Sequence, residues 1–376
     1  MKTSLSFLLR LAALVFVATL PPVALAAGEP ITIGQSLPLT GTAFFNANRV
    51  LAGAEAYVAH LNTLGGVNGR QIKLVTLDDG NDPARYAENF RTLVQTHKVA
   101  AVMNCLGDRL CQVAANMAAE HKIPLVGTIS GSAAITQREN GFVFSLRPGY
   151  GKEAEALARQ LGTMGISSVA ILSDADEKGE KITALTTHLA NLGIKTNIIN
   201  FDRKLPDAYE KMMTTLGRGQ FQAAILELDA DSVNGMMQKG LSSRPEWPPT
   251  LAMLSSGNFT HVTRSFQNRV IGFTNVVPNP ETSTIPLARE VQKVAERSGG
   301  PEAVSFEGFE SYIATNVCLE GIRRTASNLT RDGLARALRS MVNYDLGGFF
   351  VSFGKNRTGS DWVDIGLRSK NGLYTR

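Results

Sequence analysis

Three carboxylates, Asp78, Asp79 and Asp82, lie within five positions at the end of the β-forming run 72–77. Such a cluster could hold a divalent metal ion or transfer protons. A simpler interpretation is that Asp82 caps a helix, because its side chain can accept a backbone N–H and Pro83, at the first helical position, has none to satisfy. Asp78 and Asp79 would then lie in the preceding turn, where aspartate is favoured. No His or Cys lies nearby to complete a metal site, so the sequence favours a structural role.

Motifs of other catalytic and cofactor sites are missing from the sequence. It has no GxGxxG after a strand, no GxxxxGK[ST], no GxSxG and no HExxH. Ser130 follows Gly127 at the wrong spacing for a nucleophile elbow, and no histidine is placed to activate it. The sequence therefore predicts a binding protein without catalytic residues, metal or cofactor. The five histidines are isolated from one another: His60, His97, His121, His188 and His261.

The N-terminus has the order of a secretory signal peptide. Lys2 and Arg10 precede the apolar run 11–20, two prolines and the small-x-small site 24–26. This order predicts a signal peptide over 1–26, cleaved after Ala26, and hence export of the mature chain. The apolar run is shorter than the roughly 20 residues of a membrane-spanning helix.

The charge of the mature chain is mild. Removing Lys2 and Arg10 leaves 36 basic against 33 acidic residues, so the formal net charge falls from +5 to +3. Basic residues are scattered among acids and form no stripe interleaved with aromatics, so nucleic acid is not an expected partner. Cys105 and Cys111 lie six positions apart, and an exported chain meets an oxidising compartment. These two could form a disulfide, or they and Cys318 could be three buried thiols.

Strands alternate with helices along the mature chain, which predicts βαβ units and parallel sheets covered on both faces. An apolar stripe at Val50, Ala54, Tyr57, Val58 and Leu61 has the spacing of a helix. In the first half, strands are expected at 31–37, 71–77, 99–103 and 123–126.

A second series starts after 142–146, where Arg147-Pro148-Gly149 interrupts the pattern and suggests a crossing between lobes. Its expected strands are 169–172, 195–199, 223–228, 250–254 and 270–276. Three helices, 286–297, 306–325 and 329–342, and a hairpin-like tail of 347–353 and 362–367 complete the chain. Two similar α/β halves with helices added late suggest that the chain crosses between lobes more than once.

Small and polar residues follow three expected strands of the first half, at 37–46, 106–109 and 128–132. Singly, each segment could be an ordinary helix cap. In parallel α/β sheets, however, the binding crevice lies at the carboxyl ends of the strands, where helix N-termini present backbone N–H groups. The three segments at one sheet edge therefore favour a ligand site.

Several motifs resemble the leucine/isoleucine/valine-binding protein family, the periplasmic substrate-binding receptors of ABC importers. They are PLTG after the first strand, GGVNGR, DDGNDP, KIPLVGTISGSAAIT and FVFSLRPGY. The resemblance covers the mature chain, most closely up to Tyr150. It implies the type I periplasmic binding protein fold, with two Rossmann-like lobes that have parallel central sheets and are joined by three hinge crossings. The implied lobes are 27–146 with 278–345, and 147–277 with 346–376.

The resemblance also implies a set of ligand-binding positions. Amino-acid-binding members of the family have a serine at the position of Asp108, an aromatic residue at that of Lys178 and a glutamate near that of Ser256. Asn81 and Gly107 stand where the family has its first-lobe disulfide. The implied positions are Phe45, Asn46, Leu106, Asp108, Ile129, Ser130 and Ser132 in the first lobe, and Lys178, Asp229 or Ala230, and Ser256 in the second.

These substitutions allow a physical hypothesis about the ligand. Asp108 could bind an ammonium or hydroxyl group, whereas Ser130, Ser132 and their helix N-terminus could bind a carboxylate. Lys178 could pair with a second anionic group, and Phe44 or Phe45 could pack on an apolar part. We therefore expect a small carboxylate-bearing ligand, an amino acid or a relative of one, delivered to an ABC permease in the inner membrane.

The sequence also bears on other functions. A periplasmic sensor of this fold would pass the ligand signal to a receptor protein instead of a permease. An exported α/β enzyme would need a nucleophile with a base or a metal cluster, and neither is visible. A scaffold without a ligand is disfavoured by the polar strand ends, and a DNA-binding regulator by the signal peptide at the start of the chain.

Overall fold

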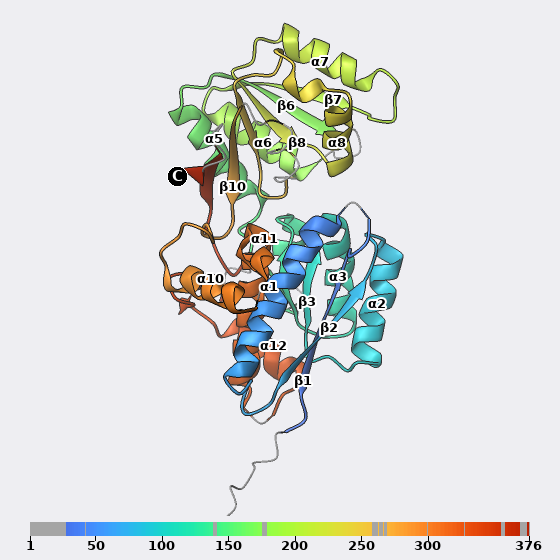
Figure 1. Cartoon of the computed structure of the whole chain (residues 1–376), viewed down its shortest axis with the longest axis vertical. Helices are drawn as coiled ribbons and strands as arrows, with labels where there is room; N and C mark the ends of the chain where they lie inside the picture. Colours follow the sequence, from blue (N-terminus) through green and yellow to red (C-terminus); the bar gives the residue numbers. More distant parts are fainter. Residues whose placement is uncertain are drawn as a thin grey trace, which may run out of the picture.

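The computed structural model describes residues 28–41, 43–137, 141–174, 179–257, 262, 266, 269–298, 300–326, 328–354, 358–368 and 374–375. The predicted signal peptide, 1–26, lies outside the described residues, as does Lys178. Two sheets with helices on both faces lie end to end, one in the lower and one in the upper half of Figure 1. We call them the first and the second lobe, and they confirm the predicted α/β fold with two parallel central sheets.

The first lobe is built on a parallel sheet in the order β2-β1-β3-β4-β5. Its strands are β1 (Ile31–Leu37), β2 (Ile72–Asp78), β3 (Val102–Leu106), β4 (Leu125–Ile129) and β5 (Val143–Phe144). The helices α2 (Pro83–Gln95) and α3 (Asp108–Glu120) bury one core, around Phe90 and Leu110. A second core, around Tyr57 and Tyr312, lies under α1 (Phe44–Thr63), α10 (Pro286–Ser298), α11 (Phe306–Arg324) and α12 (Arg331–Arg339). The last third of the chain therefore returns to the first lobe.

The second lobe is built on a seven-stranded sheet in the order β14-β13-β10-β9-β8-β6-β7. Its parallel strands are β6 (Ser168–Asp174), β7 (Lys195–Phe201), β8 (Ala223–Glu227), β9 (Thr250–Met253) and β10 (Val270–Asn275), and the antiparallel ones are β13 (Asp364–Arg368) and β14 (Tyr374–Thr375). One core lies under α5 (Tyr150–Thr163) and α6 (Glu180–Asn191). The other lies under α7 (Ala208–Arg218) and α8 (Ala230–Gln238).

The chain passes between the lobes three times, after β5, after β10 and before β13. The predicted hairpin-like tail was wrong. Its first arm, β12 (Phe350–Val351), pairs with β11 (Tyr344–Asp345), and its second arm, β13, pairs with β10 of the other lobe. The side chains of Phe349, Val351 and Phe353 are buried in the first lobe's core. The lobe boundaries stay predictions. Thr358 forms a β-bridge with Ser145 of the first lobe, so we propose that the last boundary lies after Thr358 and not at 345.

The acidic turn that follows β2 has the predicted structural role. Asp82 accepts the N–H of Arg85 at 2.8 Å, with Pro83 as the first residue of α2. Asp79 accepts the Ser36 hydroxyl at 3.0 Å, and burial raises the pKa of its carboxyl. Burial also tends to raise the pKa of Asp78, but hydrogen bonds from Gly80 and its other neighbours lower it below the ordinary value. Across the described residues, no group of three or more His, Cys, Asp or Glu side chains could hold a metal ion.

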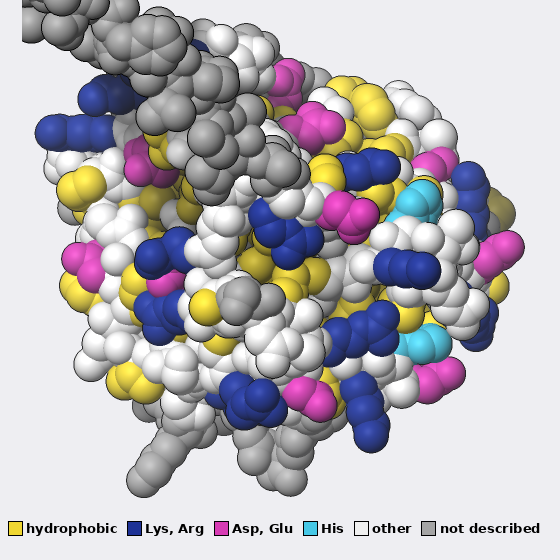
Figure 2. Space-filling view, turned by 90° about the horizontal axis from the view of Figure 1, so that it is seen from below, with side chains coloured by type: hydrophobic (Ala, Val, Ile, Leu, Met, Phe, Trp, Pro, Cys, Tyr) yellow, Lys and Arg dark blue, Asp and Glu magenta, His cyan; other side chains and the backbone are white. Residues whose placement is uncertain are grey.

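The surface agrees with the mild charge of the sequence. Seen from the end of the first lobe, Lys and Arg side chains lie interspersed with acidic, neutral and apolar groups (Figure 2). None of the helices in the described ranges is long and apolar enough to cross a membrane.

A buried ion pair anchors the first crossing to the first lobe. Arg147 lies in this crossing, and its guanidinium donates to both carboxylate oxygens of Glu310 in α11, at 2.7 and 2.9 Å. The exposed fractions of the two side chains are only 4% and 5%. Burial alone would lower the pKa of Arg147, but the charge and hydrogen bonds of Glu310 raise it above the usual value, so the guanidinium stays charged.

We predict that Glu310→Ala lowers the free energy of unfolding by about 3–5 kcal/mol, because it leaves a buried guanidinium without its counter-charge. Urea denaturation followed by circular dichroism measures this change. Replacing both partners, as Arg147→Met with Glu310→Leu, should be far less costly than the single change.

The matched control is Glu155→Ala, which breaks the exposed pair with Arg159 at 2.6 Å. Exposed ion pairs contribute about 0–1 kcal/mol to the free energy of unfolding. Equal losses for Glu310→Ala and Glu155→Ala would show that the buried pair does not anchor the crossing.

Candidate ligand-binding site

A disulfide closes the loop between β3 and α3. Cys105 bonds to Cys111 with the two Cα atoms 5.1 Å apart, which decides between the two alternatives left open by the sequence. The loop contains Gly107, whose φ of +83° would strain a residue with a side chain, and Asp108, the first residue of α3. Cys318 is a buried free thiol, and burial raises its pKa to about 12. The closed loop thus fixes Asp108 at the carboxyl end of a central strand.

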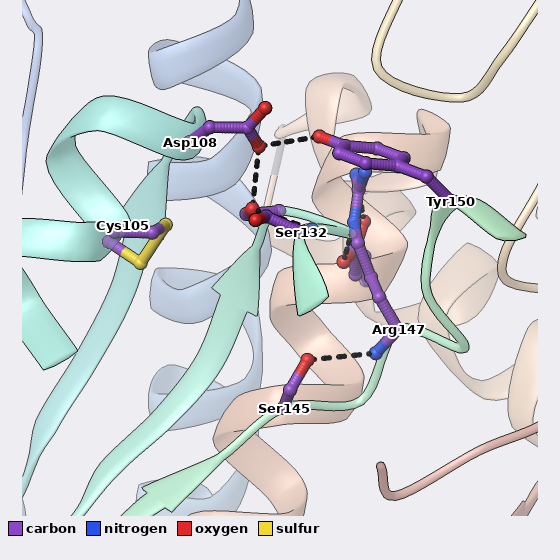
Figure 3. The surroundings of a disulfide bond; sticks show 9 residues. Cys105, Asp108, Ser132, Ser145, Arg147 and Tyr150 are labelled. Atoms are coloured by element: carbon purple, nitrogen blue, oxygen red, sulfur yellow. Dashed lines mark hydrogen bonds and ion pairs between the residues drawn. A yellow bond between two sulfur atoms is a disulfide. The ribbon is translucent and has the colours of Figure 1, made fainter. Parts of the chain in front are cut away.

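The Asp108 carboxylate joins the two lobes. It accepts the Ser130 hydroxyl at 2.6 Å from the end of β4, and the Tyr150 hydroxyl at 2.5 Å from the start of α5 in the second lobe. Figure 3 shows the Asp108 and Tyr150 side chains pointing toward one another beside the disulfide. Burial raises the pKa of Tyr150, so its hydroxyl stays protonated and donates to Asp108. Strand ends of one lobe and a helix start of the other therefore meet at one carboxylate.

The first two residues of α6 make a second contact between the lobes. The Glu180 carboxylate accepts the Ser132 hydroxyl at 3.0 Å and the backbone N–H of Ala133 at 2.8 and 3.0 Å. The next residue, Lys181, places its ammonium 3.9 Å from Asp108. The same ammonium lies 3.8 Å from Glu227 in the second lobe and 4.9 Å from the centre of the Tyr150 ring.

A small open hollow lies between the two lobes, next to the crossings. Phe306 and Glu310 line it from the first lobe, whereas Leu254 and Phe273 line it from the second. The rings of Phe273 and Phe306 meet edge to face, with centroids 5.7 Å apart. Arg147 forms part of its polar lining. The hollow has apolar walls and charged groups at one side, as small-molecule sites do.

The structure brings together the first-lobe residues that follow β3 and β4. Asp108 and Ser130 are hydrogen-bonded, and Ser132 lies two residues farther along. Leu106 and Ile129 are paired in register at the ends of their strands, and Ile129 is buried. The helix that begins after Ser132, α4 (Ala133–Thr136), has only four residues, so its dipole is small. A ligand here would therefore be bound by the Ser132 hydroxyl and the backbone N–H groups, and not by a helix dipole.

Other predicted residues lie apart from this network. Phe45 is 55% exposed in the first turn of α1, and Asn46 beside it is half-buried. Asp229 caps α8 by accepting the Ser232 N–H at 2.7 Å, and it also pairs with Arg203. Ser256 is exposed in the turn after β9. Lys178 lies outside the described residues, so the structure does not test it.

Sequence reasoning did not include Tyr150, Lys181, Glu180 or Glu227 in the site. Tyr150 ends the FVFSLRPGY motif, directly after the expected crossing at 147–149. This position between the lobes could have indicated that Tyr150 belongs to the site. Lys181 lies three positions after Lys178, which the resemblance had pointed to, and it supplies the cation of the observed network. The buried acid Glu227 ends β8, at the type of strand end that was used to find the site in the first lobe.

Known proteins resemble this chain in sequence and in structure. A family model described as periplasmic binding protein matches residues 30–239. The Leu/Ile/Val-binding protein homolog 3 of Brucella melitensis is 26% identical over 326 residues, which are 83% of this chain and 84% of that protein. A chemotactic signal transduction system substrate-binding protein, BasB of Halobacterium salinarum, is 28% identical over 139 residues, so the chain spans only 34% of that relative.

The fold is also found among solved structures. The crystal structure of a substrate-binding periplasmic protein from Ralstonia solanacearum superposes with a TM-score of 0.81 at 27% identity, covering 92% of this chain and 99% of that one. This agreement, together with the two observed sheets and three crossings, confirms the type I architecture. Since the family model covers more than half of its residues, this chain belongs to the periplasmic binding protein family, a family of solute-binding proteins rather than enzymes.

Proposed function

We propose that the protein is the extracytoplasmic solute-binding component of an ABC importer and captures a small carboxylate-bearing ligand, an amino acid or a relative, by closure of its two lobes. The observation that carries this proposal is the meeting of polar groups from both lobes at the carboxyl ends of β3 and β4. Asp108, Ser130 and Ser132 come from the first lobe, and Tyr150 and Lys181 from the second. A ligand held by both sets would favour the closed arrangement by its binding free energy, about −8 kcal/mol for micromolar affinity.

The hollow suggests how such a ligand is oriented. Its polar head would lie toward Asp108 and Ser132, where hydroxyl, N–H and carboxylate groups gather. Its apolar part would lie against Phe273 and Phe306, whose rings meet edge to face and line the hollow. We prefer this pair to the expected Phe44 and Phe45, because those two rings are 41% and 55% exposed. The name of the Brucella relative supports a ligand similar to leucine, isoleucine or valine.

A second candidate function is ligand sensing. The Halobacterium relative is named as part of a chemotactic signal transduction system. A sensor would use the same site but would pass the closed state to a receptor protein. Deletion of the gene separates the two functions, because an importer component is required for uptake of the radiolabelled ligand and a sensor is required only for the response to it.

We predict that Asp108→Ala weakens ligand binding roughly 10- to 100-fold, since hydrogen bonds to a charged group contribute about 1.5–3 kcal/mol. Ser130→Ala should weaken it less, because this hydroxyl positions the Asp108 carboxylate. Isothermal calorimetry measures both. Asp332→Ala, which removes an exposed carboxylate in the first turn of α12, should leave the affinity unchanged. Wild-type affinity in both cleft variants would remove these residues from the site.

We also predict that one class in a thermal-shift screen of amino acids, amides, dicarboxylates and aromatic acids stabilises the protein. A ligand present at about 100 times its Kd adds about 2.7 kcal/mol to the free energy of unfolding, and this increase raises the melting temperature measurably. Stabilisation by carboxylate-bearing amino acids supports the proposed function. Stabilisation by none of the four classes contradicts it.

A further inference from the structure

Two neighbouring residues of α6 place opposite charges against the first lobe. The Glu180 carboxylate takes three donor contacts there, one from the Ser132 hydroxyl and two from the Ala133 N–H. The Lys181 ammonium faces the carboxylate of Asp108 across the cleft. These contacts join the start of α6 directly to the carboxyl ends of β3 and β4.

The partners of these two charges are those that a free amino acid would use. A carboxylate is bound well by a hydroxyl and a backbone N–H that converge on it, which is the environment of Glu180. An ammonium is bound well between carboxylates and over an aromatic ring. Lys181 has this environment, with Asp108, Glu227 and the ring of Tyr150 around it at 3.9, 3.8 and 4.9 Å.

The groups in these contacts differ in burial, because Lys181 and Glu227 are shielded from water whereas Asp108 is 43% exposed and Glu180 is exposed. The exposed fraction of the Lys181 side chain is 16%, and that of Glu227 is 3%. Partly buried charges are screened by salt much less than exposed ones. The Lys181 contact is therefore screened less than a fully exposed ion pair, and together with the hydrogen bonds of Glu180 it joins the two lobes.

We propose that Glu180 and Lys181 form an internal clasp, in which two adjacent charges of the chain take the places of a ligand's carboxylate and ammonium and hold the lobes closed when no ligand is bound. The role of the clasp as a stand-in for a ligand rests on the proposed function. The closure itself does not, because all of its contacts lie within the chain.

The clasp has a consequence for ligand selection. A ligand must displace Glu180 from Ser132 and Ala133, and Lys181 from Asp108, before it can use the same groups. A molecule with both a carboxylate and an ammonium replaces the contacts that Ser132, Ala133 and Asp108 lose, whereas a molecule with one charge leaves some of these donors or acceptors unsatisfied, which is costly in a closed cleft. The clasp thus selects zwitterions and makes binding an exchange of contacts.

Small-angle X-ray scattering of the ligand-free protein tests the clasp. The proteins are the mature wild type and the variant Glu180→Gln with Lys181→Met, each unfolded, dialysed and refolded to remove carried-over ligand. We expect the wild type to be compact, with a scattering profile that matches the closed structure. The variant should shift to a larger radius of gyration because its lobes open. Circular dichroism checks that both proteins are folded.

The matched control is Glu155→Gln with Arg159→Met, which removes an exposed pair of opposite charges on α5 of the same lobe. Its radius of gyration should equal that of the wild type. If the wild type is already expanded, the clasp does not form in solution. If the clasp variant is as compact as the wild type, the clasp does not hold the lobes, and either result overturns the proposal.

The two proposals fail in different ways. The scattering experiment contains no ligand, so its result does not depend on what the protein binds. A compact wild type and an expanded clasp variant, together with no ligand in the thermal-shift screen, would support the clasp and contradict the proposed function. An expanded wild type that is stabilised by an amino acid would do the reverse.

Discussion

One buried ion pair fixes how the two lobes are joined. Glu310 is held in the first lobe by α11, and a guanidinium as buried as that of Arg147 requires such a counter-charge. Arg147 therefore sets where the chain leaves the first lobe and where α5 begins. Tyr150 starts this helix three residues later and reaches the carboxylate of Asp108. Arg147 and Glu310 also line the hollow, so the pair sets the geometry of this part of the candidate site.

Local pattern was enough to predict the elements and to bring together the first-lobe residues of the candidate site. The helical stripe of α1 is observed, with Val50, Ala54 and Tyr57 buried, because spacing alone decides which face of a helix is apolar. The cap at Asp82 is observed for a similar reason, since it depends on residues within three positions. Asp108 and Ser130 were predictable because parallel strands must bring their carboxyl ends to one edge, and the two side chains are hydrogen-bonded there.

The second-lobe side of the site could not be predicted in this way. Glu180 and Lys181 begin a helix, and their types suit an ordinary first turn as well as a cleft. Their roles depend on the angle between two lobes, a long-range quantity that no local spacing encodes. The tail shows the same limit. Segments near in sequence were expected to form a hairpin, but a crossing separates them, and β13 pairs with β10 of the second lobe instead.

The odd number of cysteines has a consequence for how this molecule matures. A third thiol could attack the Cys105–Cys111 bond and scramble it, but only as a thiolate. In the folded chain, burial raises the pKa of the Cys318 thiol to about 12, so the thiol stays protonated at neutral pH. Packing of α11 into the first lobe thus protects the Cys105–Cys111 disulfide from attack by Cys318. Before this helix is buried during folding, the thiol is able to react with that disulfide.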